Sequence, residues 1–250
     1  MRESLAVDIS VVIPAFNEAQ YLPRLMETLD VARTRYGRGA ERVEVVVADN
    51  GSTDETVDVA SASGCTVVHV SPRVIGAVRN GGAHAASGDI LVFVDADARV
   101  HPETFNAIAE YFAVPTRVLG VSGVAPERRS TGLDVTWMIL GALTALLGFG
   151  IPTSRATCVA AGVVSCRRDD WRKVGGYSER LMFAEDAHFL LALKGLGRQR
   201  GQTIGWLKDV PAVFSTRKFD EHGDWHYVRM PVRFLFAILW PDSMRRWAQR

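Results

Sequence analysis

The chain has 250 residues, of which 48% are hydrophobic and 23% charged, a composition typical of folded globular proteins that excludes disordered and collagen-like chains. Its 29 Lys and Arg residues balance 28 Asp and Glu residues, which leaves a net charge of +1. Such a chain lacks the overall basic field that drives non-specific binding to nucleic acid. We therefore expect no nucleic-acid partner, and any anion-binding site has to be local.

The cysteine content and the apolar segments bear on the compartment. Cys65, Cys158 and Cys166 are odd in number and lack C-x-x-C spacing, which argues against a disulfide framework and a thiolate zinc site. The first ten residues lack the apolar core of a signal peptide, so we expect a cytoplasmic protein. The apolar run Trp137–Ile151 has 15 residues, fewer than the ~20 needed to span a bilayer. This run and Val232–Trp240 can contact the inner face of a membrane, or the first can be a core helix.

Through the first half of the chain, short β-branched runs alternate with longer amphipathic stretches. This alternation predicts an α/β fold with an open, mostly parallel sheet flanked by helices. The strands are expected at Ile9–Ile13, Val43–Ala48, Thr66–Val70, Ile90–Val94 and Val118–Val121, and they are apolar enough to be covered on both faces. Ser52 and Glu55 form a capping-box pattern that predicts a helix over Asp54–Ser63.

After Pro126 the pattern changes. The sequence predicts a long apolar helix over Asp134–Phe149, a strand over Val159–Cys166 and a helix over Glu185–Leu196, followed by a mildly basic tail. No linker or low-complexity segment separates the halves. We therefore expect a single domain over residues 1–250, with a first half (8–125), a second half that builds the other wall of the site (126–215) and a C-terminal tail (216–250).

Polar residues follow three of the expected strands, in the segments Pro14–Glu18, Asp49–Asp54 and Asp95–Asp97. Open parallel sheets bind ligands beyond the carboxyl ends of their strands. These three segments are therefore expected to meet at one edge of the sheet and form the site.

Asp95 and Asp97 end a buried strand and are separated by one residue. Residues two apart on a strand point the same way, so both carboxylates can reach one small cation. Mg²⁺ or Mn²⁺ held by few carboxylates keeps positions open for diphosphate oxygens. The alternative is that the two acids cap the next helix or solvate a loop.

Glu185 and Asp186 open a predicted helix. Acids in the first turn are favoured by the helix dipole, which is a purely structural explanation. An acid in a cleft can instead serve as a general base toward an acceptor hydroxyl, and this is the catalytic hypothesis for the pair. His188 is interpreted as a residue of the helix face.

Three basic side chains and one histidine are candidates for contacts with a diphosphate. Arg79 lies in a segment of small residues and offers a fork of donors for a base edge or a phosphate, or else it is on the surface. In the tail, Arg217 and Lys218 can face a diphosphate, and His222 can supply a third metal ligand. A surface loop is the alternative for the tail residues.

Taken together, these motifs resemble family 2 glycosyltransferases in order and spacing. The motifs are Val11–Glu18, Ala48–Asp54, Arg79–Asn80 with Gly88–Asp89, Asp95–Asp97, Val174–Tyr177 and Glu185–Asp186. The resemblance covers residues 8–197. It implies the GT-A fold with a Rossmann-like N-terminal half, a nucleotide-diphosphate sugar donor and a divalent cation, Mn²⁺ or Mg²⁺. Residues 8–125 would then bind the nucleotide sugar, and 126–215 the acceptor.

The resemblance also implies roles for single residues. Pro14, Ala15 and Glu18 would line the nucleoside pocket, Asp49 would bond the base and Arg79 would lie nearby. Asp95 would touch the ribose and the metal, and Asp97 would bind the metal. Asp186 would be the base for an inverting displacement.

The sequence departs from the processive members of the family, which carry a Gln-x-x-Arg-Trp motif. Here Arg246 and Trp247 are present, but Ser243 stands where the motif has glutamine. Transfer of a single sugar to a hydroxyl acceptor, which can be lipid-linked, is therefore expected. One alternative is a catalytically silent nucleotide-sugar-binding scaffold. Another is a sugar-phosphate nucleotidyltransferase, which would need a glycine-rich basic loop after the first strand that Pro14–Glu18 does not provide.

Overall fold

The structure is a computed structural model that describes residues 7–146, 163–182, 184–217 and 223. Its strands are β1 (Ile9–Ala15), β2 (Val43–Asp49), β3 (Thr66–His69), β4 (Ile90–Val94), β5 (Arg117–Pro126), β6 (Val163–Arg167) and β7 (Thr203–Phe214). Its helices are α1 (Leu22–Arg35), the short 3-10 helix η1 (Ala40–Arg42), α2 (Thr56–Ala62), α3 (Ile75–Ala85), α4 (Thr104–Ala113), α5 (Thr131–Leu146), α6 (Arg168–Val174) and α7 (Glu185–Gln199).

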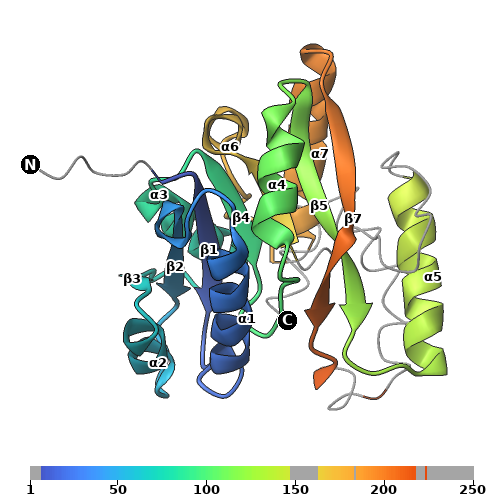
Figure 1. The fold of residues 1–250 in the computed structure, drawn as a ribbon. Helices are drawn as coiled ribbons and strands as arrows, with labels where there is room; N and C mark the ends of the chain where they lie inside the picture. Colours follow the sequence, from blue (N-terminus) through green and yellow to red (C-terminus); the bar gives the residue numbers. More distant parts are fainter. Residues whose placement is uncertain (1–6, 147–162, 183, 218–222, 224–250) are drawn as a thin grey trace, which may run out of the picture.

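The strands of the described residues form one sheet of seven strands in the order β3-β2-β1-β4-β6-β5-β7 (Figure 1). Neighbouring strands from β3 to β4 are parallel, β6 is antiparallel to both its neighbours, and β5 pairs with β7 in parallel. The predicted α/β fold class, an open and mostly parallel sheet flanked by helices, is confirmed. All strands except β6 therefore end at the same edge of the sheet.

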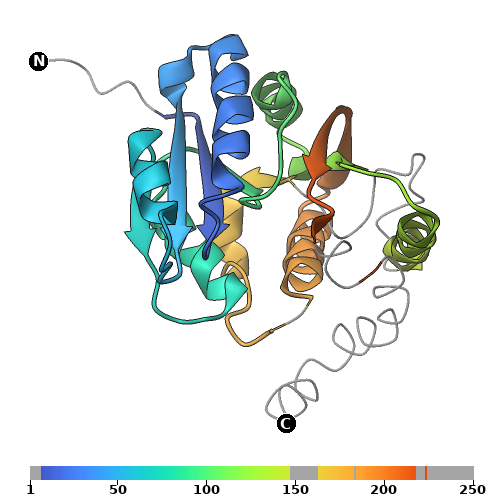
Figure 2. The same ribbon diagram turned by 90° about the horizontal axis from the view of Figure 1, so that it is seen from below.

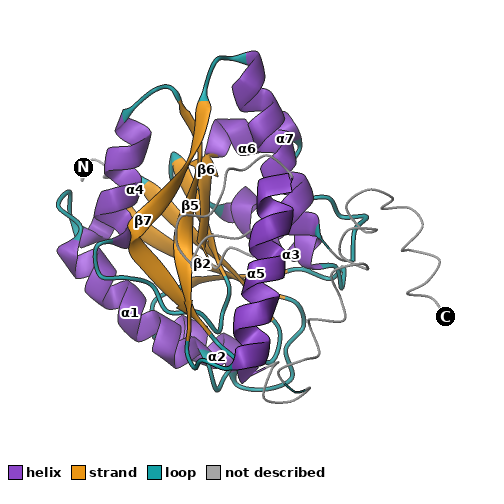
Figure 3. Ribbon diagram, turned by 90° about the vertical axis from the view of Figure 1, so that its right-hand side faces the viewer, coloured by secondary structure: helices purple, strands orange, loops and turns teal. Residues whose placement is uncertain are grey.

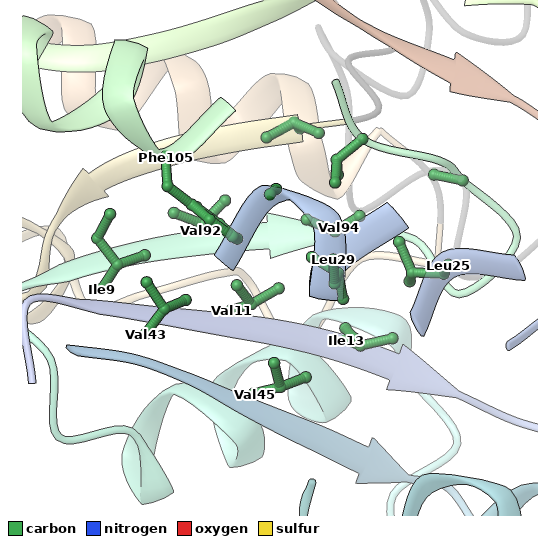
Figure 4. Packing of buried hydrophobic residues seen from close by; sticks show 14 of the residues in the cluster. Ile9, Val11, Ile13, Leu25, Leu29, Val43, Val45, Val92, Val94 and Phe105 are labelled. Carbon is green, nitrogen blue, oxygen red and sulfur yellow. The ribbon is translucent and has the colours of Figure 1, made fainter. Parts of the chain in front are cut away.

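One face of the sheet is covered by α1, α2 and α4. In the β-register Val11 lies opposite Val45 on one side and Val92 on the other, which stacks branched side chains across three strands. These valines pack against Leu29 of α1 and Phe105 of α4, all of them almost fully buried (Figure 4). Burying each such side chain contributes about 1.5–3 kcal/mol, so this layer fixes the strands that carry the site.

The other face is covered by α3, α6 and α7 (Figures 2 and 3). Its centre is aromatic: the Tyr177 ring stacks on Phe189 at a centroid distance of 4.1 Å and meets Phe93 edge-on at 4.9 Å. Phe93 belongs to β4 and Phe189 to α7, so this aromatic cluster joins the helix to the end of the strand.

Most predicted strands occur where expected, and β4 has the predicted bounds. The prediction that all strands are covered on both faces is wrong for β3, whose four residues are exposed or half-buried. The reason is its place at the edge of the sheet, where β2 is its only neighbour among the strands that the structure describes.

The predicted capping box at Ser52 and Glu55 does not form, and α2 begins at Thr56. The Ser52 hydroxyl instead accepts a hydrogen bond from the backbone N–H of Asn17, at 3.0 Å. Asp54 accepts from the backbone N–H of Thr56, at 3.1 Å. Ser52 therefore joins two loops and does not cap a helix.

Part of the chain discussed above lies outside the described residues. The helix predicted over Asp134–Phe149 is seen as α5 up to Leu146, and the strand predicted over Val159–Cys166 is seen from Val163. Cys158 and the segment Val232–Trp240 lie outside, while Cys65 and Cys166 are free thiols. None of the helices in the described ranges has both the length and the hydropathy needed to cross a bilayer.

Candidate functional site

Two loops at the carboxyl edge of the sheet are tied to each other. The backbone N–H of Glu18 donates to the Thr56 hydroxyl at 2.8 Å, and that of Ala19 donates to Asp54 at 3.2 Å. Asn17 adopts a left-handed φ of 54° and accepts a bond from the Thr53 N–H at 2.8 Å. The predicted meeting of the loops after β1 and β2 is therefore observed. The hydrogen bond from the Glu18 backbone to Thr56 fixes the position of Glu18.

Asp49, the candidate base contact, ends β2 beside Ala15 of β1. It is only 2% exposed and accepts hydrogen bonds from the backbone N–H groups of Gly51 and Ser52, each at 3.1 Å. His69 Nδ1 lies 3.1 Å from the same carboxylate. Burial works against the charged form, but hydrogen bonds from Ser52, His69 and Gly51 outweigh it and lower the pKa of Asp49. Asp49 is therefore a carboxylate that the loop keeps ionised.

Arg79 of α3 gathers three of the predicted site carboxylates. Its guanidinium lies 2.9 Å from Asp95, 2.8 Å from Glu185 and 3.0 Å from Asp186. The Arg79 side chain is 7% exposed, so the alternative that it is a surface residue is wrong. We call these four residues the Arg79 cluster. Three carboxylates share one cation, so the cluster carries a surplus of negative charge when all are ionised.

Small residues allow α3 to bring Arg79 to this position. A Cβ added to Gly82 would meet Val12 Cγ1 at 2.6 Å, and one added to Gly76 would meet the Ser178 carbonyl oxygen at 2.4 Å. The helix therefore lies against both the sheet and the segment before α7. The guanidinium rests 5.2 Å from the centre of the Tyr177 ring, a cation–π contact that fixes its plane.

Asp186 lies in the first turn of α7, one residue after Glu185. Burial raises the pKa of Asp186 to about 7; Glu185 and Asp95 add to the rise, and Arg79 opposes it. A carboxylate with a pKa near neutrality can accept and release a proton at the pH of a cell. This is the property expected of a general base.

The turn before α7 is held in an unusual conformation. Ala184, the residue before Glu185, has a left-handed φ of 58° and is 8% exposed. Non-glycine residues avoid this region, and strain of this kind concentrates at functional sites. It sets the direction in which the helix leaves the turn and so the position of the two acids.

Arg217 gathers a second set of charged residues. Its guanidinium makes a two-pronged pair with Glu18, with Nη1 donating at 2.8 Å, and its Nε lies 3.1 Å from Asp97 Oδ2. It also lies 4.5 Å from the centre of the Tyr21 ring. Burial opposes its charge, but the pairs with Glu18 and Asp97 prevail and raise its pKa. We call Arg217, Glu18 and Asp97 the Arg217 cluster.

The donor set fits a divalent cation with few protein ligands. Asp95 and Asp97 supply hard carboxylate oxygens, and the Asp95 side chain is 50% exposed. The described residues contain no group of three or more His, Cys, Asp and Glu side chains that could hold a metal ion. Mg²⁺ is commonly held by one or two carboxylates plus substrate phosphates. Asp95 and Asp97 fit a site of this kind, in which the protein and the substrate both supply ligands.

Asp95 and Asp97 contact different arginines, and the segment between them joins the two clusters. Pro14 and Ala15 are buried at the end of β1, so their side chains are not open to a ligand, while the next residue, Phe16, is 43% exposed. Lys218 and His222 lie outside the described residues. The contact of Tyr21 with Arg217 was not predicted, because an aromatic residue just before α1 carries no local signal of a contact so distant in sequence.

Residues 10–148, more than half of the chain, match the family model described as Glycosyl transferase family 2. The chain belongs to this family. The resemblance found in the motifs is thereby confirmed.

The family 2 chain is similar to several curated enzymes over part of their length. It is 34% identical over 124 residues to undecaprenyl-phosphate 4-deoxy-4-formamido-L-arabinose transferase of Pseudomonas paraeruginosa, covering 45% of this chain and 34% of that protein. It is 35% identical over 121 residues to validoxylamine A glucosyltransferase of Streptomyces hygroscopicus, covering 46% and 28%. The matches thus span about a third of those relatives.

Solved structures extend the similarity to most of the chain. Glucosyl-3-phosphoglycerate synthase from Mycobacterium tuberculosis, in complex with Mn²⁺, UDP and its glucosylated product, has a TM-score of 0.62 and 25% identity, covering 92% of this chain and 79% of that one. TarS from S. aureus in complex with UDP-GlcNAc has a TM-score of 0.61 and 19% identity, covering 84% and 59%. These neighbours support the GT-A form of the fold.

Proposed function

We propose that the protein transfers a single sugar from a nucleotide-diphosphate donor to an acceptor hydroxyl, with inversion at the anomeric carbon. The observation that carries the proposal is the Arg79 cluster, which joins a candidate donor ligand, Asp95, to a candidate base, Asp186, through one buried guanidinium. Family membership and the UDP and UDP-sugar complexes of the structural neighbours support the donor class.

In the proposed mechanism Asp186 removes the proton from the acceptor hydroxyl as that oxygen attacks the anomeric carbon. A base with a pKa near 7 suits this task, because a large fraction of it, about half at pH 7, is ionised and each ionised carboxylate is a stronger proton acceptor than an ordinary aspartate. Arg79 positions Asp186 through the ion pair and limits the rise of its pKa. Glu185 shares the same guanidinium and helps to keep it in place.

On the donor side, Asp95 and Asp97 would hold Mn²⁺ or Mg²⁺. When bound, such a cation stabilises the charge that grows on the departing diphosphate. Arg217, and Lys218 beside it in sequence, would contact the same diphosphate, and His222 remains a candidate third ligand. The nucleoside would lie against the Pro14–Glu18 segment, with Asp49 facing the base.

We propose a lipid-linked acceptor presented at the cytoplasmic face of a membrane. The support is the name of one relative, an undecaprenyl-phosphate 4-deoxy-4-formamido-L-arabinose transferase, and the apolar Met138 side chain of α5, which is 68% exposed. The acceptor half of the site would then lie beside α5.

The proposal can be tested by thermal denaturation with UDP, GDP, dTDP and CDP, each with and without Mn²⁺. A diphosphate at one hundred times its dissociation constant adds about 2.7 kcal/mol. At ~2–4 °C per kcal/mol for a chain of this size, we expect a rise in Tm of several degrees for one base. The rise should need Mn²⁺ and disappear in Asp97→Ala.

Asp186→Asn is the matched variant, because it should keep the Mn²⁺-dependent shift while losing sugar transfer by a factor of about 10²–10⁴, the usual contribution of a general base. Equal transfer rates in this variant and the wild type would exclude Asp186 as the base. Donor binding without turnover in the wild type would favour the scaffold. No shift with any diphosphate would argue against the donor site itself.

A further inference from the structure

Arg217 occupies one side of a carboxylate that the proposed function assigns to the divalent cation. We propose that Arg217 makes cation binding at Asp97 conditional on a nucleoside diphosphate. The guanidinium competes with the cation for the Asp97 carboxylate until a diphosphate is present, which can bind both the guanidinium and the cation. This inference rests on the proposed function, because it takes Asp97 as a metal ligand.

Arg217 is held tightly where it is. Nη1 and Nη2 donate to the two carboxylate oxygens of Glu18, and Nε lies 3.1 Å from Asp97 Oδ2. The Tyr21 ring covers the guanidinium at 4.5 Å, and the Ser215 hydroxyl accepts the Arg217 backbone N–H at 3.2 Å. The Arg217 side chain is 23% exposed. Its pairing with Asp97 is therefore a built contact and not a passing one of a solvated side chain.

The charges make the competition strong. The Glu18 and Asp97 side chains are 12% and 18% exposed, so water screens this cluster poorly. A dication on Asp97 would sit close to the Arg217 charge, and the two cations would repel each other. The repulsion lowers the affinity of the protein for the cation alone.

A diphosphate reverses this balance. It brings several negative oxygens to the same place, and a guanidinium binds phosphate oxygens in the fork geometry that it now uses for Glu18. Arg217 can then turn from the carboxylates to the diphosphate and release Asp97 Oδ2 for the cation. By linkage, the cation strengthens diphosphate binding by the same factor that the diphosphate strengthens cation binding.

The test is isothermal titration calorimetry on the full chain. One arm titrates Mn²⁺ without nucleotide. The other titrates UDP, or whichever of GDP, dTDP and CDP gives the largest thermal shift, with and without Mn²⁺. Arg217→Gln should bind Mn²⁺ alone at least tenfold more tightly than the wild type. Its ratio of diphosphate affinities with and without Mn²⁺ should fall by a similar factor.

Two further variants separate charge from structure. Arg217→Lys keeps the positive charge but lacks the two-pronged guanidinium, so its affinity for Mn²⁺ should lie between those of the wild type and Arg217→Gln. If the glutamine variant does not fold, the affinity of Arg217→Lys for Mn²⁺ tests whether Arg217 weakens cation binding. Arg24→Gln removes a 58% exposed arginine that pairs with Glu127 outside the site, and it should stay within twofold of the wild type.

The outcomes separate the inference from the proposed function. If Mn²⁺ strengthens diphosphate binding in the wild type but Arg217→Gln binds Mn²⁺ alone no more tightly, the coupling role of Arg217 is refuted and the donor site stands. If Mn²⁺ leaves diphosphate binding unchanged in the wild type and in every variant, both the coupling and the metal-dependent donor site are refuted.

Discussion

At the scale of single residues, Asp186 combines a reactive pKa with a cost in stability. Its pKa rises from 3.8 to about 7 on folding, chiefly because its surroundings exclude water from the carboxylate, although the side chain stays 26% exposed. Between these values the folded state binds more protons than the unfolded state, so the stability falls as the pH rises through this window. Ionised Asp186 therefore weakens the fold near neutral pH, where the proposed base would work.

This cost predicts that Asp186→Asn is more heat-stable than the wild type at pH 8. The amide cannot ionise, and Arg79 keeps its pairs with Asp95 and Glu185. Thermal denaturation from pH 5 to pH 8 should show the Tm of the wild type dropping relative to the variant. A difference in Tm that stays constant across this range would show that the ionisation of Asp186 costs nothing.

The contacts of single residues also mark what the sequence could predict. Asp95 and Asp97 could be found because two acids at the end of an apolar strand form a local pattern. The guanidinium contacts could not, since Arg79 meets Glu185 across 106 positions and Arg217 meets Glu18 across 199. The partners of these arginines are decided by the tertiary structure, when the sheet brings distant segments together.

At the scale of elements, the close approach of α3 to the sheet carries the Arg79 cluster. We predict that Gly82→Ala destabilises the protein by about 1–3 kcal/mol, because its Cβ would lie 2.6 Å from Val12 Cγ1 and overpack the layer. This clash outweighs the gain of up to ~1 kcal/mol that alanine brings to a helix. Urea denaturation measures the difference.

Gly195→Ala on α7 is the matched control. A Cβ there would meet nothing within 4 Å, so only the gain in helix propensity remains and the variant should be more stable by about 0.5–1 kcal/mol. If Gly82→Ala stabilises the protein as Gly195→Ala does, the contact between α3 and β1 is not tight enough to exclude a methyl group.

Elements were easiest to predict where burial is uniform. β4 was predicted to the residue because an apolar run between Asp89 and Asp95 has clear limits. β3 was predicted less well because it is an edge strand and is half-exposed. α2 was predicted less well because Ser52 makes a contact between loops, although its spacing from Glu55 in the sequence is that of a helix cap.

At the scale of the whole molecule, the fold places α5 directly after β5, whose end lies at the carboxyl edge of the sheet (Figure 1). If α5 meets a membrane, the protein should co-sediment with anionic vesicles, and Met138→Glu should reduce the bound fraction severalfold. Val114→Glu is the control, since Val114 is 44% exposed and precedes β5 at the opposite edge. Recovery of no protein in the pellet, with or without anionic lipid, would contradict the membrane contact.

The great sequence separation within the Arg217 cluster bears on how the protein is made. Glu18 and Asp97 lie in loops that are synthesised early, yet Arg217, which pairs with both, follows β7, the last of the described strands. Until Arg217 has been synthesised, the early half lacks the guanidinium that pairs with both acids. If this edge of the sheet binds the donor as proposed, a nascent chain acquires the complete site only after β7 has been made.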